Sequence, residues 1–323
     1  MSEFSLIKRY FTRATPGAVL GVGDDAALVR VGSGMELAVS TDMLVSGTHF
    51  FPDTDPYMLG HKALAVNISD MAAMGAQPRW ATLALSLPAE DEAWLERFSA
   101  GFFALADAYQ VELIGGDTTQ GPLNLSVTIL GEVPQGKALR RDGAQLDDEI
   151  WVSGIVGDAA LALAHMQGKL ALDEASFTAT SAALHRPVPR VVLGIALRGI
   201  ANSAIDISDG LLADLGHILE RSGVAAEIQF DALPVSTHLR GYLSQTQGLA
   251  QTLGKQCALA GGDDYELCFT APVARHAEVE KLAAQLDLPL SCIGKIVAGA
   301  GCIVRAADGS VMKIERTGYD HFA

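Results

Sequence analysis

Strand-like and helical patterns alternate along this chain, and no other feature constrains its fold as strongly. Apolar runs typical of strands occur at residues 36–40, 80–86, 111–114 and 125–131, and helical patterns at about 56–74 and 91–109. In the second helical pattern, Trp94, Phe98, Phe102 and Leu105 recur at spacings of three and four, which places them on one buried face. The first half of the chain therefore predicts a two-layer α/β domain.

A second series of this kind follows a polar, charged stretch between residues 136 and 148. It begins with Ile150-Trp151-Val152 and continues with helices near residues 157–166, 189–198 and 211–221 and strands near 266–270 and 291–297. At about 150 residues per domain, the chain is long enough for two domains. We predict a mixed α/β fold, with an N-terminal α/β domain at residues 1–140 and a C-terminal α/β domain at residues 141–323.

The balance of charge is acidic, with 23 Lys and Arg against 38 Asp and Glu and a formal net charge of −15. Nucleic acids and anionic membranes bind basic surfaces, so we expect neither as a partner. No apolar stretch approaches the roughly 18 residues that span a bilayer, and the first residues lack the basic-then-apolar order of a signal peptide. We expect a cytoplasmic protein whose four cysteines are free thiols, without a zinc site.

Acidic residues recur at the ends of apolar runs, beside small residues. Six corners of this kind occur, at residues 21–25, 39–42, 67–70, 115–119, 205–210 and 261–264. Ligands of α/β sheets bind beyond the carboxyl ends of strands, so several of these carboxylates could meet in one crevice. Each corner also has a simpler interpretation, as a helix cap or a turn in which an Asp bonds the local backbone.

Carboxylates that converge in a low-dielectric cleft repel one another and need cations to balance them. Oxygen donors from Asp, Ser and Thr, with no His or Cys beside them, favour Mg²⁺ over zinc or copper. Magnesium bound by a few carboxylates keeps positions open, and these characteristically go to substrate phosphate oxygens. The corners therefore predict a magnesium site that receives a polyphosphate.

Two alternatives from other functional classes stay open at this point. The segment Gly21-x-Gly23-x-x-Ala26 matches the dinucleotide fingerprint of a nicotinamide-dependent oxidoreductase, although Asp24 and Asp25 would repel a pyrophosphate there. A non-catalytic cation-binding protein is the second alternative, but the sequence contains no EF-hand calcium loop. A Walker A loop is also absent.

Three further features could bind a substrate or could be ordinary surface. Arg140 and Arg141 could bind terminal phosphates as a fork or remain solvated. His49 could contact a substrate or be a loop histidine with a local partner. The closing residues 318–322 (GYDHF) could dock on the core or offer an aromatic face to a ring.

An ordered set of motifs resembles one family along essentially the whole chain. The motifs are residues 3–7 (EFSLI), 21–26 (GVGDDA), 40–42 (STD), 49–50 (HF), 62–76 (KALAVNISDMAAMGA), 115–119 (GGDTT), 203–210 (SAIDISDG) and 318–322 (GYDHF). With them the chain resembles the thiamine-monophosphate kinase family, in the superfamily that includes aminoimidazole ribonucleotide synthetase and selenophosphate synthetase. Another ATP-dependent phosphoryl-transfer enzyme of that superfamily is the nearest alternative.

The resemblance implies ATP-dependent phosphorylation of thiamine monophosphate to thiamine diphosphate. It implies a homodimer formed through the N-terminal sheet, an N-terminal domain with the metal and nucleotide site, and a C-terminal domain that completes the active site. The implied ligands of several Mg²⁺ ions are Asp25, Ser40, Thr41, Asp42, Asp70, Asp117, Asp206 and Asp209. The implied ATP contacts are Gly116, Asp117, Arg141 and Ser208, and the implied substrate contacts are His49, Asp263 and Phe322.

One position departs from the family pattern. The family usually has Glu where this chain has Asp263, so the carboxylate is retracted by one methylene and its contact with substrate is the least secure. The acceptor in the implied reaction is a phosphate oxygen that is already anionic at neutral pH. We therefore expect no catalytic general base, and we expect direct in-line transfer without a covalent enzyme intermediate.

Overall fold

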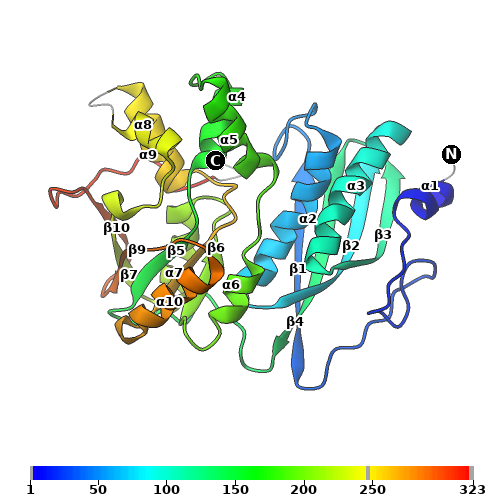
Figure 1. Cartoon of the computed structure of the whole chain (residues 1–323), viewed down its shortest axis with the longest axis horizontal. Coiled ribbons are helices and arrows are strands. Elements are labelled where there is room, and N and C mark those ends of the chain that lie inside the picture. The colour runs from blue at the N-terminus through cyan, green and yellow to red at the C-terminus, as the bar shows by residue number, and fades with distance from the viewer. Residues whose placement is uncertain (1–2, 245–247, 320–323) are drawn as a thin grey trace. The chain divides into compact units, whose positions relative to one another are not determined.

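The computed structural model describes residues 3–244 and 248–319. The chain divides into two compact units: the residues up to Met71 with Ala76–Ala138, and Ala72–Gly75 with the residues from Leu139 onward. Each unit has its own sheet and its own helices (Figure 1). The mixed α/β fold class predicted from the sequence is confirmed.

The first unit is a four-stranded sheet with helices on one face (Figure 1). Its elements are α1 (Glu3–Tyr10), β1 (Met35–Val45), α2 (Pro56–Ala73), β2 (Gln77–Leu87), α3 (Glu92–Tyr109), β3 (Glu112–Gln120) and β4 (Asn124–Pro134). The strands lie in the order β1-β4-β2-β3, so β1 and β3 are the two edges. β2 and β3 are parallel, whereas β4 is antiparallel to both of its neighbours.

The sequence of α3 explains both its start and its buried face. Asp91 caps the helix by accepting a hydrogen bond from the Trp94 backbone N–H at 3.0 Å. Phe98 and Phe102 are fully buried, Leu105 is nearly so, and the Trp94 ring stacks on Phe98 with centroids 4.9 Å apart. The predicted helix and its buried face are therefore confirmed.

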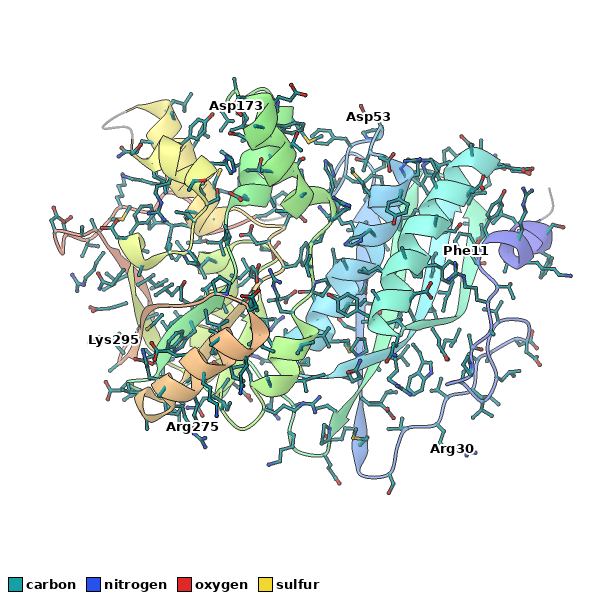
Figure 2. The ribbon with its side chains drawn as sticks, in the orientation of Figure 1. Phe11, Arg30, Asp53, Asp173, Arg275 and Lys295 are labelled. Atoms are coloured by element: carbon teal, nitrogen blue, oxygen red, sulfur yellow. The ribbon has the colours of Figure 1, made fainter. Side chains whose placement is uncertain are left out.

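Two glycines let α2 and α3 pack closely over the sheet. A Cβ on Gly60 would lie 2.1 Å from the Phe98 carbonyl oxygen, and a Cβ on Gly101 would lie 1.9 Å from the Tyr57 carbonyl oxygen. Any larger residue at either position would push the helices apart. Phe11, which follows α1, points toward α3 and brings its ring within 6.4 Å of the Phe98 ring (Figure 2).

The opposite face of this sheet is open along β1. Side chains alternate between the two faces of a strand, so Met35, Leu37, Val39 and Met43 share the open face. These four side chains are between 37% and 57% exposed. An exposed apolar edge strand is a surface that native proteins usually cover.

The second unit is built on a six-stranded sheet in the order β10-β7-β9-β5-β8-β6. Its strands are β5 (Glu149–Ser153), β6 (Ser203–Asp206), β7 (Ala225–Gln229), β8 (Leu267–Ala271), β9 (Leu290–Val297) and β10 (Gly301–Arg305). Its helices are α4 (Asp158–Met166), α5 (Glu174–His185), α6 (Val191–Ala196), α7 (Leu211–Ser222), α8 (Thr237–Leu243), α9 (Leu249–Ala260) and α10 (His276–Leu286). β10 and β7 are parallel, and the other four strand pairs are antiparallel.

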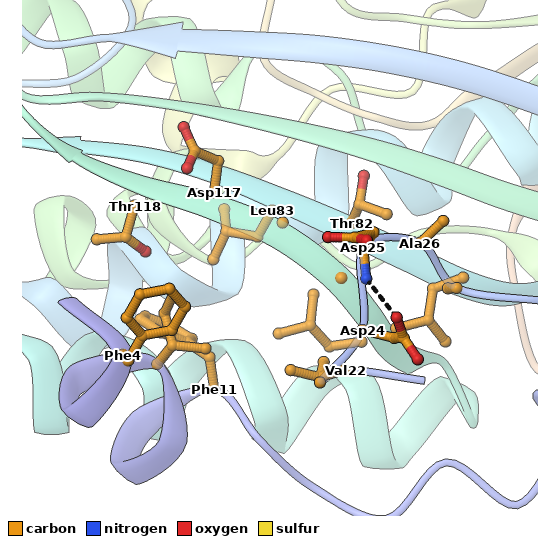
Figure 3. A pocket seen from close by; sticks show the side chains of 17 residues that line it. Phe4, Phe11, Val22, Asp24, Asp25, Ala26, Thr82, Leu83, Asp117 and Thr118 are labelled. Atoms are coloured by element: carbon orange, nitrogen blue, oxygen red, sulfur yellow. Dashed lines mark hydrogen bonds between the residues drawn. The ribbon is translucent and has the colours of Figure 1, made fainter. Parts of the chain in front are cut away.

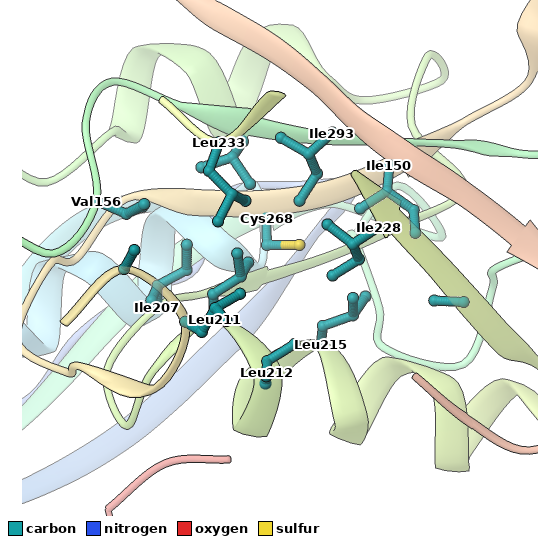
Figure 4. Packing of buried hydrophobic residues seen from close by; sticks show 14 of the residues in the cluster. Ile150, Val156, Ile207, Leu211, Leu212, Leu215, Ile228, Leu233, Cys268 and Ile293 are labelled. Carbon is teal, nitrogen blue, oxygen red and sulfur yellow. The ribbon is translucent and has the colours of Figure 1, made fainter. Parts of the chain in front are cut away.

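The core of the second unit lies between α7 and its sheet. Leu211 and Leu215 on α7 pack in one cluster with Ile228 of β7, Cys268 of β8 and Ile293 of β9 (Figure 4). All four cysteines are free thiols, as predicted. Among the described residues, no helix combines the length and apolar character needed to cross a membrane.

The structure differs from the sequence predictions in two respects. The helix predicted at residues 189–198 is shorter and runs from Val191 to Ala196. It is followed by turns at residues 197–200, where Gly199 has a left-handed φ of +76°. The acidic corners were also expected at the carboxyl ends of strands. Instead, Asp42 lies inside β1, Asp117 inside β3 and Asp70 inside α2, and only Asp206 among the proposed ligands ends a strand.

Candidate functional site

A pocket of about 600 Å³ lies in the first unit between the N-terminal segment and the β2–β3 edge (Figure 3). It is lined by Phe4 and Ile7 of α1, by Phe11, by residues 22–27, by Thr82 and Leu83 of β2, and by residues 113–118 of β3. The pocket brings together Asp24, Asp25, Gly116 and Asp117, which come from two segments far apart in the sequence. In Figure 3 the Asp117 side chain points away from the rings of Phe4 and Phe11.

The segment that carries Asp24 and Asp25 is attached to the sheet at both ends. The Gly17 N–H donates to Glu112 Oε1 at 2.7 Å, and the Gly32 N–H donates to Glu132 Oε1 at 2.7 Å. Between these anchors the backbone N–H of Asp25 donates to Asp24 Oδ1 at 2.9 Å. No helix starts between this segment and β1, so the strand–turn–helix context of a dinucleotide fingerprint is missing and the nicotinamide alternative loses its support.

Gly116 has no room for a side chain. Its φ is +155°, and a Cβ there would lie 1.9 Å from the Leu83 carbonyl oxygen on β2. The parallel register places Leu83 opposite Gly116 and Ala84 opposite Asp117. Because Gly116 has no side chain, β3 can lie against β2 and present Asp117 in the pocket.

A second group of acids lies where β1 meets α2. Ser40 Oγ donates to Asp70 Oδ2 at 2.5 Å, and the Asp42 N–H donates to Asn67 Oδ1 at 3.2 Å. Ser40 and Asp42 are two residues apart, so both side chains face α2. Thr41 points to the other face, where its hydroxyl bonds to that of Thr128 at 2.8 Å. The hydroxyl of Thr41 thus lies on the opposite face from the Ser40–Asp70 pair.

These two groups are separated across the sheet. Asp42, Val127, Leu83 and Gly116 lie opposite one another in register on the four successive strands. At about 4.8 Å between neighbouring strands, Asp42 and Gly116 are roughly 14 Å apart. In the parts of the chain that the structure describes, no group of three or more His, Cys, Asp or Glu side chains lies close enough to hold a metal ion.

In the second unit, two backbone segments bring Ser208, Asp209 and Asp263 together. The Tyr265 N–H donates to the Ile207 carbonyl at 2.8 Å, and the Asp263 N–H donates to the Ser208 carbonyl at 2.8 Å. A Cβ on Gly262 would lie 2.2 Å from the Ser208 carbonyl oxygen, so glycine is required at this crossing.

Asp263 has a backbone conformation that bears on its departure from the family pattern. Its φ is +68°, in the left-handed region that Asp adopts more readily than most side chains. The Tyr265 hydroxyl donates to Asp263 Oδ1 at 3.1 Å. A local hydroxyl therefore orients this shorter carboxylate.

The remaining predicted residues fall in three environments. His49 is half-buried in the turn after β1, and its Nδ1 accepts the Val45 N–H at 3.0 Å. Arg141 is exposed, whereas the neighbouring Arg140 pairs with Asp142. Asp206 is 4% exposed at the end of β6. Phe322 lies outside the described residues, but the Tyr319 N–H donates to the Asp209 carbonyl at 3.0 Å, so the C-terminal segment reaches this loop.

Sequence reasoning missed two residues that position these groups. Asn67 is buried in α2, where it accepts from Asp42 N–H and donates to the Ala63 carbonyl at 3.0 Å. Asp214, in the first turn of α7, accepts hydrogen bonds from the backbone N–H groups of Ser208, Asp209 and Gly210. Burial, together with the nearby Asp209, raises the pKa of Asp214 to about 7, although the three N–H groups oppose this rise. In the sequence, Asn67 lies three residues before Asp70, and Asp214 lies four residues after Gly210. Each spacing is about one helical turn, and this spacing is the signal that could have identified the two residues.

Family models match both units of the chain. Residues 23–133 match the model described as AIR synthase related protein, N-terminal domain, and residues 145–306 match AIR synthase related protein, C-terminal domain. The thiamine-monophosphate kinase of Salmonella typhimurium is 47% identical over 325 residues, which covers 99% of this chain and 98% of the relative.

Two solved structures resemble the chain over nearly its full length. The crystal structure of thiamine-monophosphate kinase from Stenotrophomonas maltophilia K279a is 50% identical, with a TM-score of 0.86, and the match covers 97% of this chain and 98% of that one. The structure of AaThiL complexed with AMPPCP and TMP is 33% identical, with a TM-score of 0.77, and the match covers 99% of this chain and 96% of that one.

Proposed function

The chain belongs to the AIR synthase related family, and from this premise we propose that it transfers a phosphoryl group from ATP to thiamine monophosphate, giving thiamine diphosphate and ADP. The observation that carries the proposal is the identity of 47% with a thiamine-monophosphate kinase over 99% of this chain. A relative of the same fold is described in complex with AMPPCP and TMP, an ATP analogue and an acceptor phosphate. The expected family and activity agree with these comparisons.

The proposed site uses oxygen donors for Mg²⁺. In the first unit we propose as ligands Asp25, Ser40, Asp42, Asp70 and Asp117, together with a main-chain oxygen of Thr41, and in the second unit Asp206 and Asp209. The donor set fits a hard divalent cation, because the pocket offers Asp carboxylates, Thr118 and glycine backbone, with no His or Cys in its lining. When bound, Mg²⁺ would neutralise phosphate charge and favour in-line geometry at the transferred phosphorus.

The chain's own residues would bind and orient the two anionic substrates. The backbone at Gly116, with Asp117, Ser208 and Arg141, would contact ATP; an exposed guanidinium such as Arg141 suits a terminal phosphate. His49, Asp263 and Phe322 would contact thiamine monophosphate. Because His49 Nδ1 accepts the Val45 N–H, the neutral ring carries its proton on Nε2.

We further propose direct transfer without a general base. The attacking atom is a phosphate oxygen that is anionic at neutral pH, so no residue has to remove its proton. Orientation of two polyanions against their repulsion is the main task of the site. Phosphorylated enzyme formed from ATP alone would contradict this mechanism.

The proposed enzyme is a homodimer formed through the first unit's sheet, with the open faces of the two copies turned toward each other and their edge strands paired. Met35, Leu37, Val39 and Met43 are exposed there, and a second copy would cover them. Strands β1 and β3 are the two edges of the sheet, and their backbones at Asp42 and Gly116 are roughly 14 Å apart within one chain. Pairing β1 with β3 of the partner would bring Asp42 near Asp117 of the partner subunit, which would complete the site.

Four free thiols also favour a reducing, cytoplasmic location.

The activity is tested by ADP formation with thiamine monophosphate, with unphosphorylated thiamine and with no acceptor, at controlled Mg²⁺. We expect ADP only when Mg²⁺ and thiamine monophosphate are both present. Asp117→Asn should lower this rate by about two orders of magnitude or more, while Asp107→Asn, at an exposed acid of the same unit paired with Arg13, should leave it unchanged. Equal ADP formation without the acceptor, or only with a different acceptor phosphate, would overturn the proposal.

A further inference from the structure

The Asp214 carboxylate lies at the centre of the turn that leads into α7. Its Oδ2 accepts three backbone N–H groups in succession, from Ser208 at 2.9 Å and from Asp209 and Gly210 at 3.0 Å each. The side chain is buried, with 3% of the residue exposed. A single carboxylate oxygen therefore fixes three consecutive peptide units.

The carbonyl groups of the same turn point to other partners. The Ser208 carbonyl accepts the Asp263 N–H at 2.8 Å, and the Asp209 carbonyl accepts the Tyr319 N–H at 3.0 Å. The N–H side of the turn thus faces Asp214, and its carbonyl side faces the segments that carry the proposed substrate contacts. The orientation of each peptide plane in the turn is set from both sides.

In the part of the chain that the structure describes, the residue that caps α7 makes no side-chain hydrogen bond of its own. Gly210 precedes α7 with a φ of +128° and offers no side chain, and a Cβ there would lie 2.7 Å from the Ala260 backbone. The N–H groups at the start of a helix need acceptors, and here an acid of the first turn reaches back to supply one. Without Asp214, three N–H groups in the turn would lose their acceptor.

We propose that Asp214 is a positioning residue for the nucleotide site. By fixing the Ser208–Gly210 turn, it holds the Asp209 carboxylate and the Ser208 side chain in the orientation that binds ATP with Mg²⁺. Asp214 itself touches neither ATP nor the acceptor. This inference rests on the proposed function, because it assigns the turn to the nucleotide site.

The test compares Asp214→Ala and Asp214→Asn with a matched control, Asp148→Ala. Asp148 is also 3% exposed, and its Oδ2 accepts from three groups: the Gln145 N–H at 2.9 Å, the Asn202 side chain at 2.9 Å and the Thr270 hydroxyl at 3.2 Å. Its loss should therefore cost comparable stability without touching the Ser208–Gly210 turn.

Equilibrium binding of AMPPCP with Mg²⁺ is the main readout, since it needs no turnover. Asp214→Ala should weaken binding by about tenfold or more, because the three backbone N–H groups of the turn lose their acceptor. Asp214→Asn keeps a neutral acceptor and should weaken binding by about threefold. In both variants the backbone amides of residues 208–210 should exchange with deuterium faster than in the wild type, while Asp148→Ala should match the wild type in both measurements.

Binding by Asp214→Ala within about twofold of wild type, or an equal loss in Asp148→Ala, would overturn the inference. If Asp214→Ala does not fold, Asp214→Asn decides: wild-type affinity with wild-type amide exchange would refute the role. A failure of the proposed function gives a different result from a failure of this inference. In that case the wild-type protein would bind AMPPCP with Mg²⁺, and Asp214→Ala would weaken that binding, but the wild-type protein would not phosphorylate thiamine monophosphate.

Discussion

Gly116→Ala tests the closest backbone contact in the candidate site. The new Cβ would lie 1.9 Å from the Leu83 carbonyl oxygen and 2.8 Å from its carbon, at a φ of +155°. Such contacts essentially never fall below 3.0 Å, so β3 would have to move by at least 3.0 − 1.9 = 1.1 Å from β2. The displaced stretch of β3 includes the neighbouring Asp117.

The expected cost has two parts. Positive-φ strain at an alanine contributes about 1–3 kcal/mol, and overpacking against β2 contributes about 1–3 kcal/mol. We expect the free energy of unfolding of the first unit to fall by at least about 2 kcal/mol, or at least about 4 °C in its melting temperature. Because misplacement by about 1 Å can cost about a hundredfold in rate, we expect a loss of that order in kcat/KM.

Calorimetry and the acceptor-dependent ADP assay measure these two effects. Gly216→Ala in α7 is the matched control, because no heavy atom lies within 4 Å of its built Cβ and its φ is ordinary. Alanine there should stabilise the protein by roughly 0.5–1 kcal/mol. A Gly116→Ala variant with wild-type melting temperature and wild-type kcat/KM would refute the reasoning.

Three further predictions concern charge, pH and assembly. Asp42→Asn should lower turnover by orders of magnitude while the melting temperature without Mg²⁺ stays within a few degrees of wild type; a large fall in that temperature would indicate a structural role instead. Burial raises the pKa of Asp264 well above its usual value, and the nearby Glu266 and Asp158 add to this rise. The protonated carboxyl therefore stabilises the folded protein fully below about pH 4, the pKa of an unfolded Asp. This stabilisation is lost as the pH rises through the pKa of Asp264 in the folded protein. Urea unfolding between pH 5 and 8 should therefore show a smaller loss of stability with rising pH in Asp264→Asn than in wild type, and parallel curves would contradict this. Val39→Lys, on the open sheet face, should give a monomer in sedimentation with little ADP formation, whereas an active monomer would refute a shared site.

Local patterns predicted much of the fold because they carry their own physical signals. The periodicity of Phe98, Phe102 and Leu105 and the cap at Asp91 determine α3 without reference to distant residues. Short elements such as α6 were harder to define, because a helix of six residues derives little stability from its own sequence.

The acids of the proposed site can be picked out one by one from the sequence, but their mutual geometry depends on strand pairing. Asp42 and Asp117 lie on opposite edges of one sheet, and that separation follows from the order β1-β4-β2-β3, which no local pattern contains. Strand alternation similarly places Thr41 on the opposite face from Ser40. Asp214 was not predicted as a functional residue, because acidic residues are common in the first turn of a helix. Its hydrogen bonds to three backbone N–H groups depend on the folded conformation of the turn, which the sequence pattern does not contain.

The most direct test of the central claim is a product analysis in which γ-labelled ATP, Mg²⁺ and thiamine monophosphate are incubated with the purified protein. Phosphoryl transfer predicts label in thiamine diphosphate, in a one-to-one ratio with ADP, no label on the protein, and no product when Mg²⁺ is chelated. Label in inorganic phosphate or on the protein, with none in thiamine diphosphate, would contradict the account.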